Sequence, residues 1–311
     1  MTQVLTTVIP VFAIIGLGYL LAKRKLFSQA GVDDLTRFIF YLAVPALLFR
    51  TSASGVMERD LELSVLLGYY GVGIAILLIV TFLLKRIGYE RAIVAAISAC
   101  FSNLALIGLP IVQTAYGNDA LVPLMTIITF NAMVLFTSSC VLIETARNPN
   151  ANILGIVIGA IKSVATNPLV IGLVGGWLFA HSGLDMPVII DRTTDMLGRA
   201  AAPCALFAVG GGMARYSLRL EETTLPVLSA TFAKLIVMPV AVWSITTYVI
   251  EASPLWVMIA TLAAAMPTGA NPFVFATRYG VGDRIAGNAI LLTTALSLIT
   301  ISTFIVFFPH P

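Results

Sequence analysis

Two apolar stretches of this sequence combine an asparagine with residues that break helices. The first reads SACFSNLALIGLPIVQTAYG and the second reads MPTGANPFVFATRYG. Each belongs to an apolar segment long enough to cross a bilayer, where no water can bond to backbone groups that a break leaves free. The residues of interest are Asn103, Gly108 and Pro110 in the first stretch, and Pro267, Gly269, Asn271 and Pro272 in the second.

Breaks of this kind predict a binding site built from helix ends. Proline removes an amide donor, glycine lets the chain leave helical geometry, and the freed backbone must line a cavity or be covered by protein. The start of a half-helix then offers amides to an anion, and the end of the preceding one offers carbonyls to a cation. Asn103 and Asn271 add uncharged donors and acceptors that suit a carboxylate. Alternatively, these residues only kink their helices and bond to a neighbour.

Two further polar residues lie inside apolar segments. Lys234 is nine residues beyond Leu225, about 13 Å along a segment that crosses about 30 Å. A lysine at that depth normally faces a cavity or a partner, so it can attract a substrate carboxylate, or lose its proton and couple transport to protons. A purely structural lysine is the other interpretation. Asn131 is a further candidate for the pocket.

Composition argues against a water-soluble protein and against several kinds of chemistry. Of 311 residues 59% are hydrophobic and 11% charged, and the mean hydropathy is +0.99, which is more apolar surface than one soluble core can bury. The net charge of +3 comes without a basic stripe, so we expect no binding of nucleic acid. The two histidines and three cysteines lack metal-ligand spacing, and no paired carboxylates fall within a span. We therefore expect no enzyme activity, no cofactor and no metal site.

Hydrophobic runs of about 20 residues predict ten membrane-spanning helices. A shorter apolar segment, 152–165, carries Lys162, and we expect it to lie along the membrane surface. With the amino terminus outside, the inner loops hold twelve lysines and arginines and the outer loops four, so both termini are expected outside. The predicted spans are 4–22, 35–53, 62–84, 92–116, 120–143, 167–183, 196–214, 225–250, 255–279 and 285–308.

The two halves of the chain resemble each other at an offset of 158 residues. Residues that match at this offset include Pro10 and Pro168, Gly18 and Gly176, Asp33 and Asp191, and Pro45 and Pro203. Five spans per half is an odd number, so the second copy would enter the membrane upside down, as in many secondary transporters. We therefore expect an all-α membrane protein of two inverted five-helix repeats, 1–146 and 167–311, with broken helices 4 and 9 and a cytoplasmic linker, 147–166. Chance matching of apolar sequences is the alternative.

The segments IPVFAIIGLGYLLAKRKLF, RFIFYLAVPALLF, SNLALIGLPIV, FAKLIVMPV and GANPFVFATRYG together resemble the auxin efflux carrier family, in particular its compact bacterial members. The resemblance implies a fold related to bile-acid symporters, in which the fourth and ninth helices cross at mid-membrane. It places Pro110, Asn271 and Pro272 at the crossing and Lys234 close to it. It also implies a homodimer formed through the first, second, sixth and seventh helices, in the bacterial inner membrane.

The broken helices and the resemblance together predict a secondary active or potential-driven transporter of small organic anions, such as malonate, malate or an auxin-like acid. Elevator-like or rocking motion would expose one central site to each side in turn. The partners expected are the anion and the lipid bilayer, and coupling to protons or sodium stays open. The alternatives are a sodium-coupled organic anion symporter of the bile-acid type and a membrane sensor that does not transport. The expected substrate-binding residues are Asn103, Gly108, Pro110, Asn131, Lys234, Gly269, Asn271 and Pro272.

Overall fold

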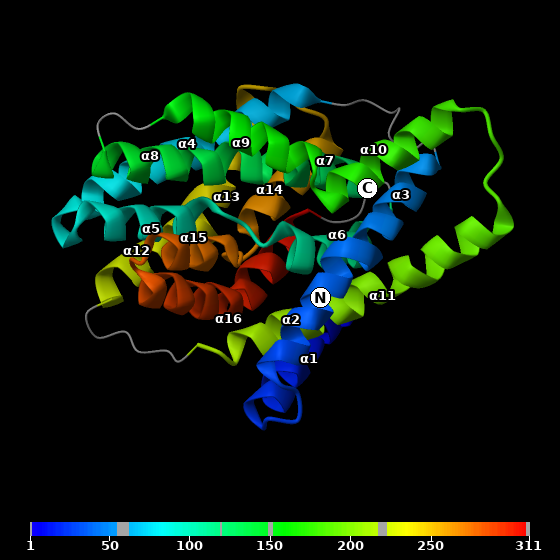
Figure 1. The fold of residues 1–311 in the computed structure, drawn as a ribbon, viewed down its shortest axis with the longest axis horizontal. Coiled ribbons are helices and arrows are strands. Elements are labelled where there is room, and N and C mark those ends of the chain that lie inside the picture. The colour runs from blue at the N-terminus through cyan, green and yellow to red at the C-terminus, as the bar shows by residue number, and fades with distance from the viewer. Residues whose placement is uncertain (1, 55–61, 119, 149–151, 217–222, 309–311) are drawn as a thin grey trace.

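The fold is helical throughout the part of the chain that the computed structural model describes, residues 2–54, 62–118, 120–148, 152–216 and 223–308 (Figure 1). These ranges contain no strand, and their extended backbone pairs in one isolated antiparallel bridge between Ser102 and Thr268. The expectation of an all-α protein is confirmed.

The described residues form helices of very different lengths. In chain order, the first eight are α1 (Thr2–Lys23), α2 (Gln29–Phe38), α3 (Val44–Ala53), α4 (Leu63–Leu84), α5 (Tyr89–Cys100), α6 (Leu109–Tyr116), α7 (Leu121–Asn131) and α8 (Thr137–Arg147). The next eight are α9 (Ile153–Ala165), α10 (Pro168–His181), α11 (Val188–Met213), α12 (Thr224–Phe232), α13 (Met238–Tyr248), α14 (Pro254–Ala265), α15 (Asn271–Tyr279) and α16 (Asp283–Phe307). Short turns of π or 3-10 geometry connect some of them: η1 (Ile39–Ala43), η3 (Lys85–Ile87), η4 (Leu104–Gly108), η5 (Ala132–Phe136) and η7 (Ala233–Val237).

Several helical stretches are long and apolar enough to cross a membrane. Among the described residues five meet both criteria, namely Leu63–Ile87, Leu121–Arg147, Val188–Met213, Thr224–Tyr248 and Asp283–Phe307. Shorter apolar helices are Val8–Lys23, Leu104–Tyr116, Pro168–His181 and Pro254–Ala265. The chain is therefore a multi-pass membrane protein.

Three of the π turns are followed, after one further residue, by a proline. The amides of Val44, Leu109 and Met238 each donate to the carbonyl five residues earlier, and the residue that follows each is proline. A proline inside a helix clashes with the carbonyl four residues before it, and a π turn moves that carbonyl out of the way. Pro45, Pro110 and Pro239 thus continue their helices instead of ending them.

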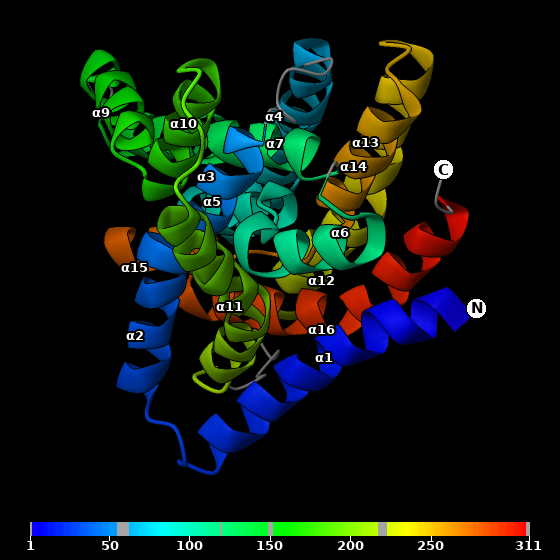
Figure 2. The same cartoon turned by 90° about the vertical axis from the view of Figure 1, so that its right-hand side faces the viewer.

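The helices form two groups, which lie side by side in Figure 1; in Figure 2 one group lies in front of the other. In one group α1 packs on α11, and α3 packs on both α10 and α11. The other group contains α4, α5 and α12 to α16, with the most extensive contacts between α4 and α5 and between α13 and α14. In Figure 1 the first group occupies the right of the molecule and the second group the left. We call them the α1–α11 group and the α4–α16 group.

Within the α1–α11 group the helices approach each other at glycine. A Cβ atom added to Gly18 of α1 would collide with the backbone carbonyl of Phe207 on α11. A Cβ atom added to Gly176 of α10 would collide in the same way with the backbone carbonyl of Phe49 on α3. These helix pairs are therefore in backbone contact, which only glycine permits.

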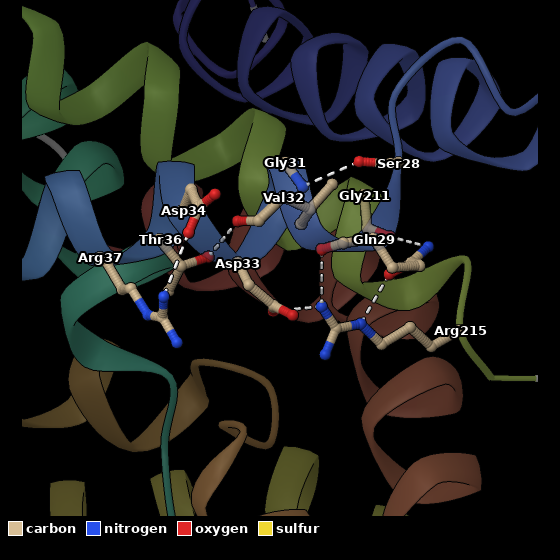
Figure 3. A network of polar contacts seen from close by, with 10 residues as sticks. All are labelled: Ser28, Gln29, Gly31, Val32, Asp33, Asp34, Thr36, Arg37, Gly211 and Arg215. Carbon is tan, nitrogen blue, oxygen red and sulfur yellow. Dashed lines mark hydrogen bonds and ion pairs between the residues drawn. The ribbon is translucent and has the colours of Figure 1, made fainter.

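Ion pairs tie α11 to both ends of α2–α3. Arg215, just beyond α11, donates to the Asp33 carboxylate and to the Gln29 side chain at 2.6 Å, and both partners lie on α2 (Figure 3). At the other end of α11 the Arg50 guanidinium of α3 binds Asp191 at 2.7 Å and Asp195 at 3.0 Å. The two helical segments therefore run antiparallel and are linked at both ends.

Residues 147–166, the expected linker, contain helix α9, which contacts α8 and α10. Its apolar side chains Leu154, Ile158 and Ile161 are exposed. An apolar face of this kind suits contact with lipid.

Adding a methyl group at the backbone contacts should destabilise the α1–α11 group. We expect Gly18→Ala and Gly176→Ala each to lower the free energy of unfolding by about 1–3 kcal/mol, because the new Cβ atom must push a backbone away. Thermal unfolding in detergent measures the effect. Gly16→Ala and Gly175→Ala are matched controls, since a Cβ atom there meets open space or an ordinary contact at 3.7 Å. Equal stability of Gly18→Ala and Gly16→Ala would contradict the packing argument.

Candidate functional site

Two helices are interrupted where they cross at the centre of the α4–α16 group. α5 ends at Cys100 and helical structure resumes at Leu104, while α14 ends at Ala265 and α15 begins at Asn271. The two intervening segments pair antiparallel: the Asn103 amide donates to the Pro267 carbonyl at 2.8 Å, and the Gly269 amide donates to the Phe101 carbonyl at 3.0 Å. Each break therefore satisfies part of the backbone that the other break exposes.

Four helix ends meet at this crossing. The carbonyl ends of α5 and α14 lie there together with the amide ends of η4 and α15. Amide ends carry a partial positive charge and carbonyl ends a partial negative charge, because the terminal groups lack partners within the helix. The crossing can therefore bind an anion at one pair of ends and a cation at the other pair.

Buried hydroxyl groups hold the crossing segments in place through hydrogen bonds. The Thr268 hydroxyl donates to the Ser98 carbonyl of α5 at 2.7 Å, and the Thr268 amide donates to the hydroxyl of Thr293 on α16 at 3.1 Å. The hydroxyls of Ser102 and Tyr69 lie 3.2 Å apart within hydrogen-bond range. All of these side chains are buried. They are absent from the residues predicted from sequence, where the one signal is that Ser102 and Thr268 directly precede Asn103 and Gly269.

The two asparagines lie on either side of the crossing. Asn103 immediately precedes η4, and Asn271 is the first residue of α15. Both are partly exposed, although their neighbours Ser102 and Pro272 are buried. Within the described residues neither side-chain amide donates or accepts a hydrogen bond. The amides are therefore available to a ligand beside the positive helix ends.

The glycines and prolines named from sequence have different positions relative to the crossing. Gly269 lies in it, and a Cβ atom there would stand 3.3 Å from the Ser102 carbonyl oxygen. Pro272 occupies the first turn of α15 and is buried. Gly108 and Pro110 lie beyond the break, at the junction of η4 and α6, where Pro110 is accommodated by the π turn. The first break is at 101–103, so Pro110 itself lies in the helical segment that follows it.

Lys234 lies on η7, next to the end of α14 at the crossing. Its side chain is fully buried, with 0% exposed. The ammonium donates to the carbonyl of Ala264 in the last turn of α14, and it lies 3.5 Å from the Met238 sulfur. The η7 turn that carries Lys234 also packs on α5. The Lys234 amino group therefore lies at the carbonyl end of α14.

Asn131 is separate from the crossing segments in sequence and ends α7. It is 5% exposed, and its Oδ1 atom has no hydrogen-bond partner within the described residues. A buried amide oxygen without a partner is costly, so it commonly binds water or a ligand. α7 contacts both η4 and α14, the helical segments on either side of the crossing. The position fits a pocket residue.

Two cavities with polar linings lie near opposite ends of α11. The larger, of about 550 Å³, is lined by Arg50, Asp191 and Arg199 of the α1–α11 group and by Gln113 of α6. The smaller, of about 280 Å³, is lined by Arg215, Tyr216, Arg284 and by Phe273 of α15. Each cavity thus reaches the second half of one interrupted helix. Among the described residues no three His, Cys, Asp or Glu side chains group to hold a metal ion.

The sequence matches the membrane transport protein family over residues 3–305. A Rhizobium meliloti (strain 1021) protein named "Putative malonate transporter" is 29% identical over 305 residues, which cover 97% of this chain and 95% of the relative. Auxin efflux carrier component 8 of Arabidopsis thaliana is 22% identical over 96% of this chain and 95% of its own length. An uncharacterized transporter of Escherichia coli (strain K12) is 24% identical over 94% of this chain and 93% of its own.

The match spans nearly the whole chain, including both interrupted helices and Lys234. Relatives from a plant and from bacteria align over more than nine tenths of this chain. This chain belongs to the membrane transport protein family, the family of the auxin efflux carriers, and is a membrane transporter.

Proposed function

We propose that this protein is a secondary transporter of small organic anions that works by alternating access around the crossing of α5–α6 and α14–α15. The observation that carries the proposal is the antiparallel pairing of the two breaks, at 2.8 and 3.0 Å, beside two partly exposed asparagines. Interrupted helices whose ends meet are the usual substrate and ion sites of secondary transporters. The amide ends of η4 and α15 suit an anion, and the asparagine amides suit its carboxylate oxygens.

We also propose ten spans arranged as two inverted repeats, residues 1–146 and 167–311, joined by 147–166. The contacts of Gly18 with Phe207 and of Gly176 with Phe49 support this arrangement. Adding 158 to Gly18 gives Gly176, and adding 158 to Phe49 gives Phe207. The two contacts therefore exchange under the offset found in the sequence, as a twofold relation between the repeats requires.

The two helix groups suggest which parts move. Backbone contacts at glycine and ion pairs at both ends of α11 make the α1–α11 group the stiffer body. The crossing is formed mainly by helices of the α4–α16 group, and its η4 turn also packs on α11. In the proposed motion the α4–α16 group carries the bound anion past the α1–α11 group, and the cavities beside Arg50 and Arg215 are its two exits.

The proposed substrates are small carboxylates. The Rhizobium meliloti relative is named for malonate and the plant relatives for auxin, and both acids carry carboxylate groups. Asn103, Gly269 and Asn271 are proposed to contact the substrate directly, with Asn131 at the edge of the pocket. Gly108, Pro110 and Pro272 are proposed to shape the helix ends that face it.

The position of Lys234 favours coupling to membrane potential or protons over coupling to sodium. Carbonyl ends of interrupted helices are where transporters bind a cation. Here the Lys234 ammonium already donates to the Ala264 carbonyl of α14. A built-in charge removes the need for a sodium ion at that place, and it draws an anion toward the crossing.

The proposed location is the bacterial inner membrane, with both termini outside. The proposed assembly is a homodimer formed through α1, α2–α3, α10 and α11. Exposed apolar residues along α10 and α11, among them Ile171, Leu178 and Ile189, leave apolar surface for such a contact or for lipid.

Removing either asparagine amide at the crossing should stop transport without unfolding the protein. We expect Asn103→Ala and Asn271→Ala each to lower carboxylate flux at least about tenfold, since each loses a hydrogen bond to a charged group worth about 1.5–3 kcal/mol. Flux of labelled malonate into proteoliposomes gives the measurement. Asn152→Ala is the control, because that asparagine directly precedes α9 and caps Gly155. Normal flux in both crossing variants would refute a role in binding.

Carboxylate flux should not require sodium. In proteoliposomes that contain the protein, we expect uptake of malonate, malate or indole-acetate to respond to an imposed voltage or pH gradient. Replacing sodium by choline should leave that uptake unchanged. A strict sodium requirement would favour the symporter alternative, and binding in detergent without any flux would favour a sensor.

Lys234→Ala should weaken anion binding and destabilise the fold. The substitution leaves the Ala264 carbonyl without its buried donor, which costs about 1–3 kcal/mol. It also removes a positive charge next to the crossing, so we expect the dissociation constant for malonate to rise about tenfold or more. Binding in detergent at several pH values, with thermal unfolding measured alongside, separates the two effects. A variant that loses stability but keeps its affinity at every pH would assign Lys234 to packing alone.

A further inference from the structure

One arginine connects the far ends of the two interrupted helices. Arg147, the last residue of α8, donates from Nε and Nη2 to the two carboxylate oxygens of Glu90, at 2.8 and 2.7 Å. Its Nη2 atom also donates to the backbone carbonyl of Tyr279 at 2.8 Å. Glu90 is the second residue of α5, and Tyr279 is the last residue of α15. A single guanidinium therefore holds α5 and α15 together at the ends that face away from the crossing.

The geometry of this contact fixes the relative orientation of Arg147 and Glu90 as well as the distance between them. A guanidinium that binds both oxygens of a carboxylate lies in one plane with it, a geometry that lysine cannot reproduce. The Tyr279 carbonyl is one of the last of α15, where Gly280 ends the helix in the left-handed conformation with φ of 68°. Such carbonyls lack partners within the helix, and a cation bound to them is favourable.

Other contacts hold the same three elements. The Tyr279 hydroxyl donates to Glu144 of α8 at 3.1 Å, and the Arg147 guanidinium lies 5.3 Å from the centre of the Tyr279 ring. The Arg147 hydrogen bond holds the pKa of the Glu90 carboxyl below its usual range. Because its pKa is lowered, the Glu90 carboxyl is ionised at neutral pH, and the ion pair is lost only in acid, when the carboxyl is protonated.

The backbone hydrogen bonds at the crossing do not fix the angle between α5 and α15, and the Arg147 contact limits that angle. The two backbone hydrogen bonds between 101–103 and 267–269 lie close together, so they act as a pivot. α5 has 12 residues and α15 has 9, which are arms of about 18 and 13 Å at 1.5 Å per residue. A contact at the ends of such arms controls the angle between them far more tightly than a contact at the pivot.

We propose that Arg147 is a positioning residue that sets the angle between α5 and α15, and through it the directions of the helix ends at the crossing. The effect on substrate rests on the proposed transport of carboxylates, whereas the effect on the crossing does not. Arg147 touches neither crossing segment, so it acts entirely through the two helices that it joins.

The first test combines hydrogen exchange with binding in Arg147→Gln. We expect the amides of Asn103 and Gly269 to exchange at least about tenfold faster, and the dissociation constant for malonate to rise about tenfold. Exchange in α1 and α11 should stay at the wild-type rate. Arg37→Gln is the matched control, because Arg37 makes an exposed ion pair with Asp34 on the same helix and should change neither quantity. A general loss of stability would instead raise exchange in all helices.

The second test separates the ion pair from the helix-end contact. The double variant Glu90→Arg, Arg147→Glu restores a pair of opposite charges, but a glutamate at 147 cannot donate to the Tyr279 carbonyl. We expect the fast exchange at Asn103 and Gly269 to persist in this variant. Arg147→Lys, which keeps a donor and a charge, should recover part of the wild-type protection.

The outcomes decide between the proposals. Wild-type exchange at the crossing in Arg147→Gln, or full recovery in the charge-exchanged variant, would overturn the positioning role. If wild-type protein binds no carboxylate, the proposed function fails, and the exchange measurement still decides the role of Arg147. If Arg147→Gln does not fold, Glu90→Gln keeps the Tyr279 contact and weakens only the pair, and an intermediate rise in exchange is then expected.

Discussion

The structure depends on one requirement, that no backbone amide or carbonyl be left without a partner in the interior of the membrane. Two helices of this chain are interrupted within apolar segments, and each interruption would be costly by itself. The two interrupted segments pair antiparallel, through the hydrogen bonds of Asn103 with Pro267 and of Gly269 with Phe101. These bonds satisfy the backbone groups in the middle of each interruption. The groups that remain at the four helix ends are the ones that can bind charge. The proposed site is thus a consequence of how the two breaks pair.

The surroundings of the crossing keep that arrangement in place. Thr268 binds α5 and α16 at once, and Lys234 binds the end of α14. These partners come from several helices of the α4–α16 group and link the crossing to that group. The α1–α11 group is held differently, by backbone contacts at glycine and by Arg50 and Arg215 at the two ends of α11. Two bodies with separate internal bonds suit the proposed alternation between two sides.

The sequence was sufficient to predict the helical class, the membrane character and the second break. Pro267 and Gly269 fall in the interruption itself, and Pro272 suits the first turn of the helix that follows. The first break was harder, because Gly108 and Pro110 are stronger breakers than Phe101 to Asn103 and yet lie within helical turns. The π turn before Pro110 depends on one amide reaching a carbonyl five residues back, which composition does not encode. The break at 101–103 is fixed by its partner segment, a tertiary contact.

The same limit applies to the charged residues. Lys234 is recognisable from its depth in an apolar segment, but its partner, a backbone carbonyl thirty residues later in the chain, is not. Arg147 has the sequence context of an ordinary interfacial charge after a span, and its contacts with Glu90 and Tyr279 join positions 57 and 132 residues apart. Spacing along a helix predicts neighbours within one turn or two, and it carries no information on contacts between distant helices.

The contacts of Gly18 and Gly176 are made with main-chain atoms, and so are the bonds that form the crossing. Main-chain atoms are the same in every protein, so no exchange of one side chain for another removes them, provided that the few glycines remain. A sequence can therefore differ from this one at most side chains and still form these contacts, as long as Gly18 and Gly176 stay glycine.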